Sequence, residues 1–73
     1  MNKNFKSRER MIVVDLKNYH IVTDILRDLG VQWTSKNTKG FELNVIQFEM
    51  TLPKFTIVES ILKKKKCEYK ILE

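Results

Sequence analysis

The sequence has few of the residues that crosslink a small domain. Its 73 residues include a single cysteine, Cys67, and a single histidine, His20. A disulfide within the chain is therefore impossible, and no cysteine and histidine cluster has metal-site spacing. A domain of this size buries only about 60% of the surface that its unfolded chain exposes. Because both common crosslinks are missing, we expect self-association to add stability.

Long hydrophobic segments are also missing. The longest apolar run covers only residues 11–14, whereas a membrane-spanning helix requires about 20 apolar residues. No signal-peptide pattern follows the polar N-terminus. We therefore expect a cytoplasmic protein.

Residues for catalysis are scarce. Beside His20 and Cys67 there are only dispersed acidic residues, and Asp24 and Asp28 fit the solvated face of a helix. No nucleophile with a base, and no metal-ligand set, can be assembled from these residues. The turn expected at residues 16–19 also lacks the glycine that would let backbone approach a small ligand. The sequence predicts no enzyme, no cofactor, no metal site and no small-molecule substrate.

Positive charge is concentrated at the two ends of the chain. Residues 1–10 carry four basic and one acidic residue, residues 11–53 carry four and five, and residues 54–70 carry six and two. The net charge is +5. This distribution favours an anionic partner such as RNA. The alternative is that the excess lysine serves only solubility.

Hydrophobic periodicity predicts alternating strands and helices after a flexible basic arm at residues 1–9. Residues 10–73 form a single α+β domain. Strands are expected at residues 10–17, 31–34, 40–50 and 69–72, with a polar hairpin turn at 35–40. Helices are expected at residues 19–29, capped by Asn18 and stopped by Gly30, and from Thr51 to the lysines at 63–66, with Pro53 in the first turn.

The strand at residues 40–50 is apolar on both faces because its pattern changes phase. Phe41, Leu43 and Val45 fall on one face, and a second apolar set, Ile46, Phe48 and Met50, falls on the other. Such a strand belongs in the interior of a sheet. The element order then predicts a ferredoxin-like β-α-β-β-α-β sandwich with an antiparallel sheet of strand order 4-1-3-2 and both helices on one face. The alternative is a frayed C-terminal helix without the fourth strand.

In this fold one face of the sheet has no helix over it, and an apolar surface there favours a homodimer. The residues expected at the dimer interface are Met11, Val13, Phe41, Leu43 and Val45. Trp33 is expected in the core at the sheet edge, because Val31 shares its face.

The segment Lys39-Gly40-Phe41 resembles the opening of the strand-three motif in RNA-binding modules of this fold, in which aromatic side chains stack on bases. The resemblance covers three residues. Glu42 replaces a small residue of that motif, Asn44 a valine, and Ile46 the second aromatic.

The predicted topology brings several lysines to one pole of the domain, at the ends of the first strand, the hairpin and the second helix. The residues expected to bind nucleic acid are Lys17, Lys36, Lys39, Phe41, Lys63, Lys64, Lys65 and Lys66. The sequence thus predicts a small non-catalytic RNA-binding protein, for which a regulatory role is one option. The alternative is a protein-binding inhibitor or antitoxin-like adaptor, for example phage-encoded, that docks through the sheet.

Overall fold

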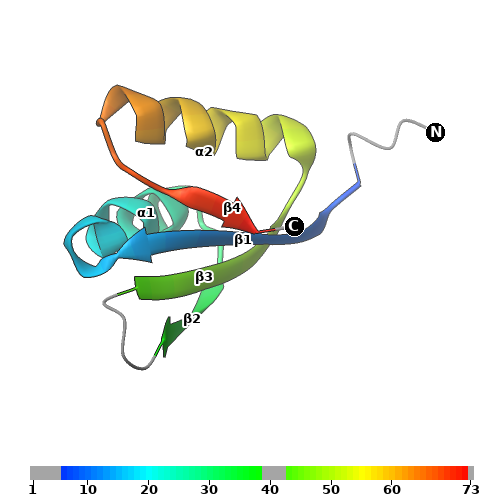
Figure 1. Ribbon diagram of the computed structural model, residues 1–73. Helices are drawn as coiled ribbons and strands as arrows, with labels where there is room; N and C mark the ends of the chain where they lie inside the picture. Colours follow the sequence, from blue (N-terminus) through cyan, green and yellow to red (C-terminus); the bar gives the residue numbers. More distant parts are fainter. Residues whose placement is uncertain (1–5, 39–42, 73) are drawn as a thin grey trace.

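A computed structural model describes residues 6–38 and 43–72 of the chain (Figure 1). The elements are β1 (Arg8–Asp15), α1 (Leu16–Asp28), β2 (Trp33–Thr38), β3 (Leu43–Met50), α2 (Leu52–Lys64) and β4 (Lys70–Leu72). The predicted class is confirmed: the chain forms a small α+β domain with a four-stranded antiparallel sheet and two helices.

The strand order is β2-β3-β1-β4, which reads 4-1-3-2 when it is counted from the β4 edge. The two central strands, β1 and β3, pair along their whole length, from Arg8 opposite Met50 to Asp15 opposite Leu43. The edge strand β4 forms, so the alternative of a frayed C-terminal helix is wrong. It is short, however, and pairs only three residues with β1.

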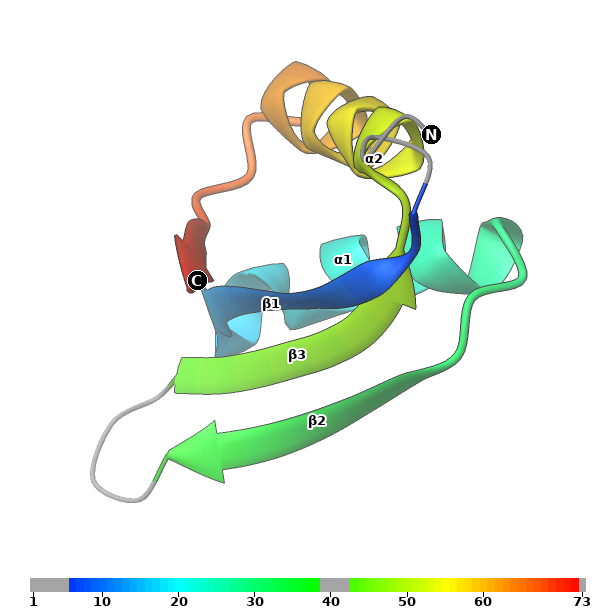
Figure 2. The same cartoon turned by 90° about the vertical axis from the view of Figure 1, so that its right-hand side faces the viewer.

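The core lies between the sheet and the two helices. Figure 2 shows α1 behind β1 and β3, with α2 above them. The buried apolar side chains come from β1, α1, β3, α2 and the segment after it: Ile12, Val14, Val22, Ile25, Leu26, Ile46, Phe48, Met50, Phe55, Val58, Leu62 and Cys67. The phase change within β3 is confirmed, because Ile46, Phe48 and Met50 are buried against the helices while Leu43 is exposed on the other face.

The first helix begins three residues earlier than its apolar stripe predicts. The Asp15 side chain, not that of Asn18, caps α1 by accepting a hydrogen bond of 2.9 Å from the Asn18 backbone N–H. Asn18 is buried within the first turn instead. Aspartate and asparagine are equally good N-caps, so the choice depends on β1, which leads directly into the helix.

The end of α1 is as predicted. Gly30 has a φ of +72°, in the left-handed region that glycine tolerates. Its N–H bonds to the Arg27 carbonyl at 3.0 Å, and the Val31 N–H bonds to the Leu26 carbonyl at 2.9 Å. These two bonds form a Schellman motif. The start of α2 is also as predicted, with Thr51 at the N-cap and proline in the first turn.

The boundaries of the strands differ from the prediction. β1 starts at Arg8, so Arg8 and Glu9 pair with β3 instead of belonging to the arm. β2 covers Trp33–Thr38, because polar residues expected in the turn extend the strand along β3. Such polar side chains are tolerated because β2 is an edge strand and one face of the sheet is open to water. The expected strand at 40–50 is observed from Leu43, and its first three residues lie outside the described ranges.

Candidate nucleic-acid interface

Four consecutive lysines, which we call the lysine turn, end the second helix: Lys63, Lys64, Lys65 and Lys66. Lys63 and Lys64 form the last turn of α2, and Lys65 is its C-cap. All four residues are exposed. None of them lies on the buried stripe of α2, whose last residue is Leu62.

The lysine turn closes α2 with the hydrogen bonds that also close α1. The Lys66 N–H bonds to the Lys63 carbonyl at 3.1 Å, and the Cys67 N–H bonds to the Leu62 carbonyl at 3.0 Å. Lys66 therefore stands where Gly30 stands in α1, and its φ is +57°. In this conformation an L-residue with a Cβ atom is destabilised by about 1–2 kcal/mol.

The charges of the lysine turn are not neutralised by ion pairs in the described part of the chain, where the ion pairs join Arg27 to Asp24 and to Asp28. Glu59, which lies one helical turn before Lys63, instead accepts a 2.9 Å hydrogen bond from the Tyr69 hydroxyl. Burial and this bond raise the pKa of Tyr69 to about 12. At neutral pH the hydroxyl therefore keeps its proton and donates to Glu59.

Lys17 lies near the lysine turn although it belongs to α1. It is an exposed residue of the first helical turn. The next residue, Asn18, donates from Nδ2 to the carbonyl of Glu68 at 3.5 Å. This contact holds the segment after the lysine turn against the start of α1. The helical turn that carries Lys17 therefore lies against the segment that follows the lysine turn and includes the exposed Glu68.

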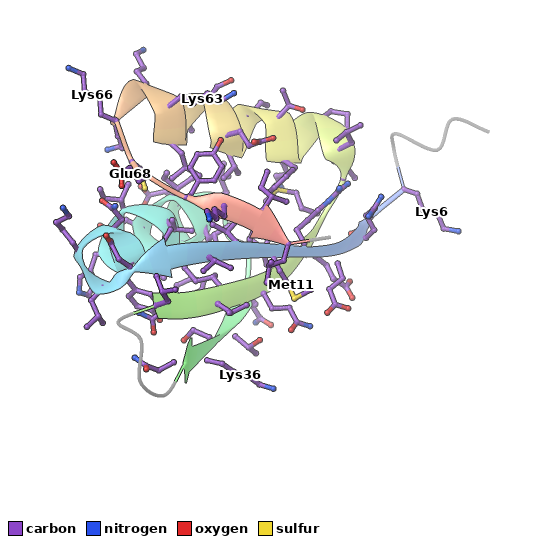
Figure 3. All side chains as sticks on the ribbon, viewed as in Figure 1. Lys6, Met11, Lys36, Lys63, Lys66 and Glu68 are labelled. Carbon is purple, nitrogen blue, oxygen red and sulfur yellow. The ribbon has the colours of Figure 1, made fainter. Side chains whose placement is uncertain are left out.

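Lys36 does not join this group. It lies within β2, directly opposite Val45, rather than in a turn. In Figure 3, Lys36 projects below the sheet, whereas Lys66 lies above it at the end of α2. Lys36 and the lysine turn therefore lie on opposite sides of the sheet, and the single pole that contains both stays a prediction. Lys39 and Phe41 lie outside the described residues.

Two of the residues compared with the RNA-binding strand motif face the core. Ile46 is fully buried and Asn44 is 7% exposed. The opposite face of β3 carries Leu43, Val45, Gln47 and Glu49 over its described length. None of these is aromatic, so this part of β3 offers no platform on which a base could stack.

The open face of the sheet carries Met11, Val13, Leu43 and Val45, as expected of the predicted dimer interface. Figure 3 shows Met11 pointing away from α2. Leu72 joins them, since it pairs with Met11. Leu72 is 45% exposed and Leu43 is 38% exposed. The sequence alone missed Leu72 because the register of β4 depends on where the preceding turn ends.

Trp33 lies opposite Phe48, and therefore on the core face, at the start of the edge strand. It is only partly buried and packs against the core from its margin. Beside it is a surface groove lined by Val31, Glu9 and Glu49, among others.

Two general features follow from the described ranges. Within them, no group of three or more histidine, cysteine, aspartate or glutamate residues is placed to hold a metal ion. No helix there has the length and apolar character that a membrane span requires.

No protein-family model matches the sequence, and no curated protein is similar to it. The fold is similar to the crystal structure of an uncharacterized protein conserved in bacteria, DUF2179, from Eubacterium ventriosum. The TM-score is 0.63 at 20% sequence identity, and the match covers 89% of this chain and 96% of the other. At this identity, the similarity concerns the fold alone.

Proposed function

We propose that this is a small, non-catalytic RNA-binding protein whose lysine turn, together with Lys17, contacts the phosphate backbone. The observation that carries the proposal is Lys66, a lysine in a left-handed position where the same motif in α1 has glycine. Strained residues that a fold retains often mark functional positions. A lysine here projects its ammonium group beyond the helix end, which glycine cannot do.

The helix macrodipole explains the presence of only some lysines of the lysine turn. Lysines in the last turn of a helix are stabilised by the macrodipole, and this explains Lys63 and Lys64. Lys65 and Lys66 follow the last helical residue, and Lys66 adds conformational strain. An anionic partner explains Lys65 and Lys66 better, because the lysine turn exposes four consecutive lysines and the start of α1, which carries a fifth exposed lysine, Lys17, lies against the segment that follows it.

The contacts that these lysines can make are contacts to phosphate. Lysine is a point charge on a flexible stem, which suits the backbone of a nucleic acid and not the reading of base edges. The described part of the open sheet face supplies no stacking aromatic. We therefore expect binding with little sequence preference and strong dependence on salt.

Fluorescence anisotropy with a labelled single-stranded RNA of about 20 nucleotides tests this function, since that length covers more than the five phosphates required. With about five phosphate contacts, the slope of log affinity against log salt should lie between about −3 and −4. Affinity should then fall roughly a hundredfold between 50 and 200 mM salt. Absence of binding at 50 mM salt would contradict the proposal. Tighter binding to single-stranded DNA of the same sequence would contradict the choice of RNA.

A protein-binding adaptor is the second candidate function. The apolar open face of the sheet favours it, because soluble monomers rarely leave a contiguous apolar surface in water. An adaptor that docks through this face should bind its partner with little salt dependence. The two functions use different surfaces, so charge reversal in the lysine turn separates them.

Two finer assignments belong to this proposal. We assign the domain to the ferredoxin-like β-α-β-β-α-β class, which the strand order and the placement of the helices support. We also propose a cytoplasmic location. The free, buried thiol of Cys67 is compatible with a reducing compartment.

A further inference from the structure

We infer that the open face of the sheet joins two copies of this chain, stacked about a two-fold axis that lies perpendicular to the strands. The inference does not rest on the proposed RNA binding, since the lysine turn lies on the helix side of the molecule. It rests on the order of charged and apolar residues across the open face, which the strand registers define.

Side chains opposite each other in adjacent antiparallel strands point to the same face. The central row of the open face therefore consists of Thr34, Gln47, Met11 and Leu72. A basic row lies two residues from the central row in one direction along the strands, and it consists of Lys36, Val45, Val13 and Lys70. An acidic row lies two residues from the central row in the other direction, and it consists of Glu49 and Glu9.

The acidic and basic rows are thus equally far from the central row and on opposite sides of it. The two lysines of the basic row flank its two valines, so the valines form one apolar surface with Met11 and Leu72. The face also carries charges of both signs near its margin. Interfaces commonly combine an apolar centre with a polar rim in this way.

A two-fold axis along the central row and perpendicular to the strands brings the acidic row of one copy over the basic row of the other. Glu9 then faces Val13 of the second copy, beside that copy's Lys70. Glu49 faces Val45, beside Lys36. The central rows of the two copies pack on each other, and all four acidic side chains gain lysine neighbours.

A two-fold axis parallel to the strands gives the opposite result. Each row of one copy then faces the same row of the other copy, so that glutamates oppose glutamates and lysines oppose lysines. Like charges that face each other across an interface oppose association. The charge pattern therefore selects the perpendicular axis.

The same charge pattern indicates that the partner covering the open face is a second copy of this chain. The face complements itself, because each charged row matches the other after rotation. Four strands of up to eight residues cover on the order of 400–500 Å² in projection. The area that two such faces bury together reaches only the lower limit for stable protein interfaces. We therefore expect a dimer with a dissociation constant in the micromolar range.

Sedimentation velocity of the full chain, measured from about 1 to 200 µM so as to bracket a micromolar constant, tests the interface. The wild type should change from monomer to dimer over this range. Val13→Lys, at a half-buried position on the open face, should remain a monomer. The matched variant Ile57→Lys changes an exposed residue of α2 and should dimerise normally. A wild type that stays monomeric at 200 µM, or a Val13→Lys variant that still dimerises, would overturn the inference.

Charge exchange tests the orientation. Glu9→Lys with Glu49→Lys, and separately Lys36→Glu with Lys70→Glu, should each weaken dimerisation by about ten- to a hundredfold, because like rows then face each other. The chain carrying all four substitutions should recover most of the wild-type affinity. Within one copy the two rows are four residues apart along the strands, too far for direct pairing. If the effects of the two sets simply add, with no recovery, the perpendicular axis is wrong.

Discussion

Gly30 and Lys66 occupy the same position of the same motif at the ends of the two helices. Their φ angles are +72° and +57°, and each follows a C-cap residue whose helix is closed by two backbone bonds of 2.9 to 3.1 Å. Glycine adopts this conformation without cost, whereas lysine does not. At the end of α2, Lys66 therefore lowers the stability of the fold while it exposes a positive charge.

The variant Lys66→Gly should be more stable than the wild type. Removing the strained Cβ should raise the free energy of unfolding by about 1 kcal/mol, measured by urea denaturation. The same variant should bind RNA more weakly, because it loses one phosphate contact. Lys65→Gly is the matched control: its φ is −84°, so glycine relieves no strain there. A destabilised Lys66→Gly would show that the left-handed lysine is not strained.

Gly30→Lys provides the reciprocal variant. Apart from Gly30 and its two chain neighbours, no described residue has an atom within 4 Å of the position that a Cβ would take at Gly30, so only backbone conformation opposes the substitution. We expect a loss of about 1 kcal/mol in the free energy of unfolding. A loss of several kcal/mol would mean that packing, and not φ, determines this position.

Asn44→Leu should also stabilise the fold. The Asn44 side-chain amide is buried: its Oδ1 accepts a hydrogen bond from Asn37 Nδ2 at 3.5 Å, but its Nδ2 has no hydrogen-bond partner among the described residues. Replacing an unsatisfied buried donor by an apolar side chain of similar size should raise the free energy of unfolding by about 1 kcal/mol. Asn18→Leu is the control, because Asn18 is equally buried but donates to Glu68. If both variants lose stability in thermal denaturation, the Asn44 amide is satisfied in solution.

Trp33→Ala should cost about 2 kcal/mol, less than the 3–5 kcal/mol of a fully buried tryptophan. The reason is that Trp33 covers only the margin of the core. Phe48→Ala, at the opposite position and 3% exposed, should cost more than Trp33→Ala. Equal losses in urea denaturation would place the indole fully in the core.

The pKa of Tyr69 predicts a decline in stability at high pH. Its folded value of about 12 lies above the ordinary value of 10.0, first because of burial and then because of Glu59. The stabilisation is therefore complete below pH 10 and is lost as the pH rises through about 12. Ultraviolet titration of Tyr19→Phe, in which Tyr69 is the remaining tyrosine, should give a midpoint near 12. Glu59→Gln should lower it, and an unchanged midpoint would exclude the hydrogen bond as a cause.

Much of the fold could be predicted from the sequence, because the apolar periodicities of the helices and of residues 40–50 reflect burial directly. The element order, the change of apolar phase within β3 and the glycine that ends α1 all follow from local patterns, whereas the face of β3 that packs on the helices does not. The start of α1 could not be predicted, since Asp15 and Asn18 are both suitable caps and only the path of β1 decides between them.

The candidate site was predicted less completely. The lysine turn is visible as a charge run, but the position of Lys36 depends on how far β2 extends along β3. The polar sequence of residues 35–38 suits a turn as well as an edge strand, so the choice between them is made by pairing with β3. The left-handed conformation of Lys66 was missed because the sequence pattern of a Schellman motif normally includes glycine. An apolar residue at 62 followed by lysines gives no comparable signal.

The most direct test of the account compares two variants with the same change in net charge. Lys64→Glu with Lys65→Glu reverses two charges of the lysine turn. Lys6→Glu with Lys54→Glu instead reverses two exposed lysines away from it: Lys6 lies at the opposite end of the molecule (Figure 3), and Lys54 lies in the first turn of α2. Circular dichroism should show both to be folded. In the anisotropy titration, the first variant should lower RNA affinity at least tenfold and reduce the magnitude of the salt slope by about 1.4. The second should change affinity by less than about threefold, through net charge alone. Equal losses in the two variants would contradict a phosphate-binding site at the lysine turn.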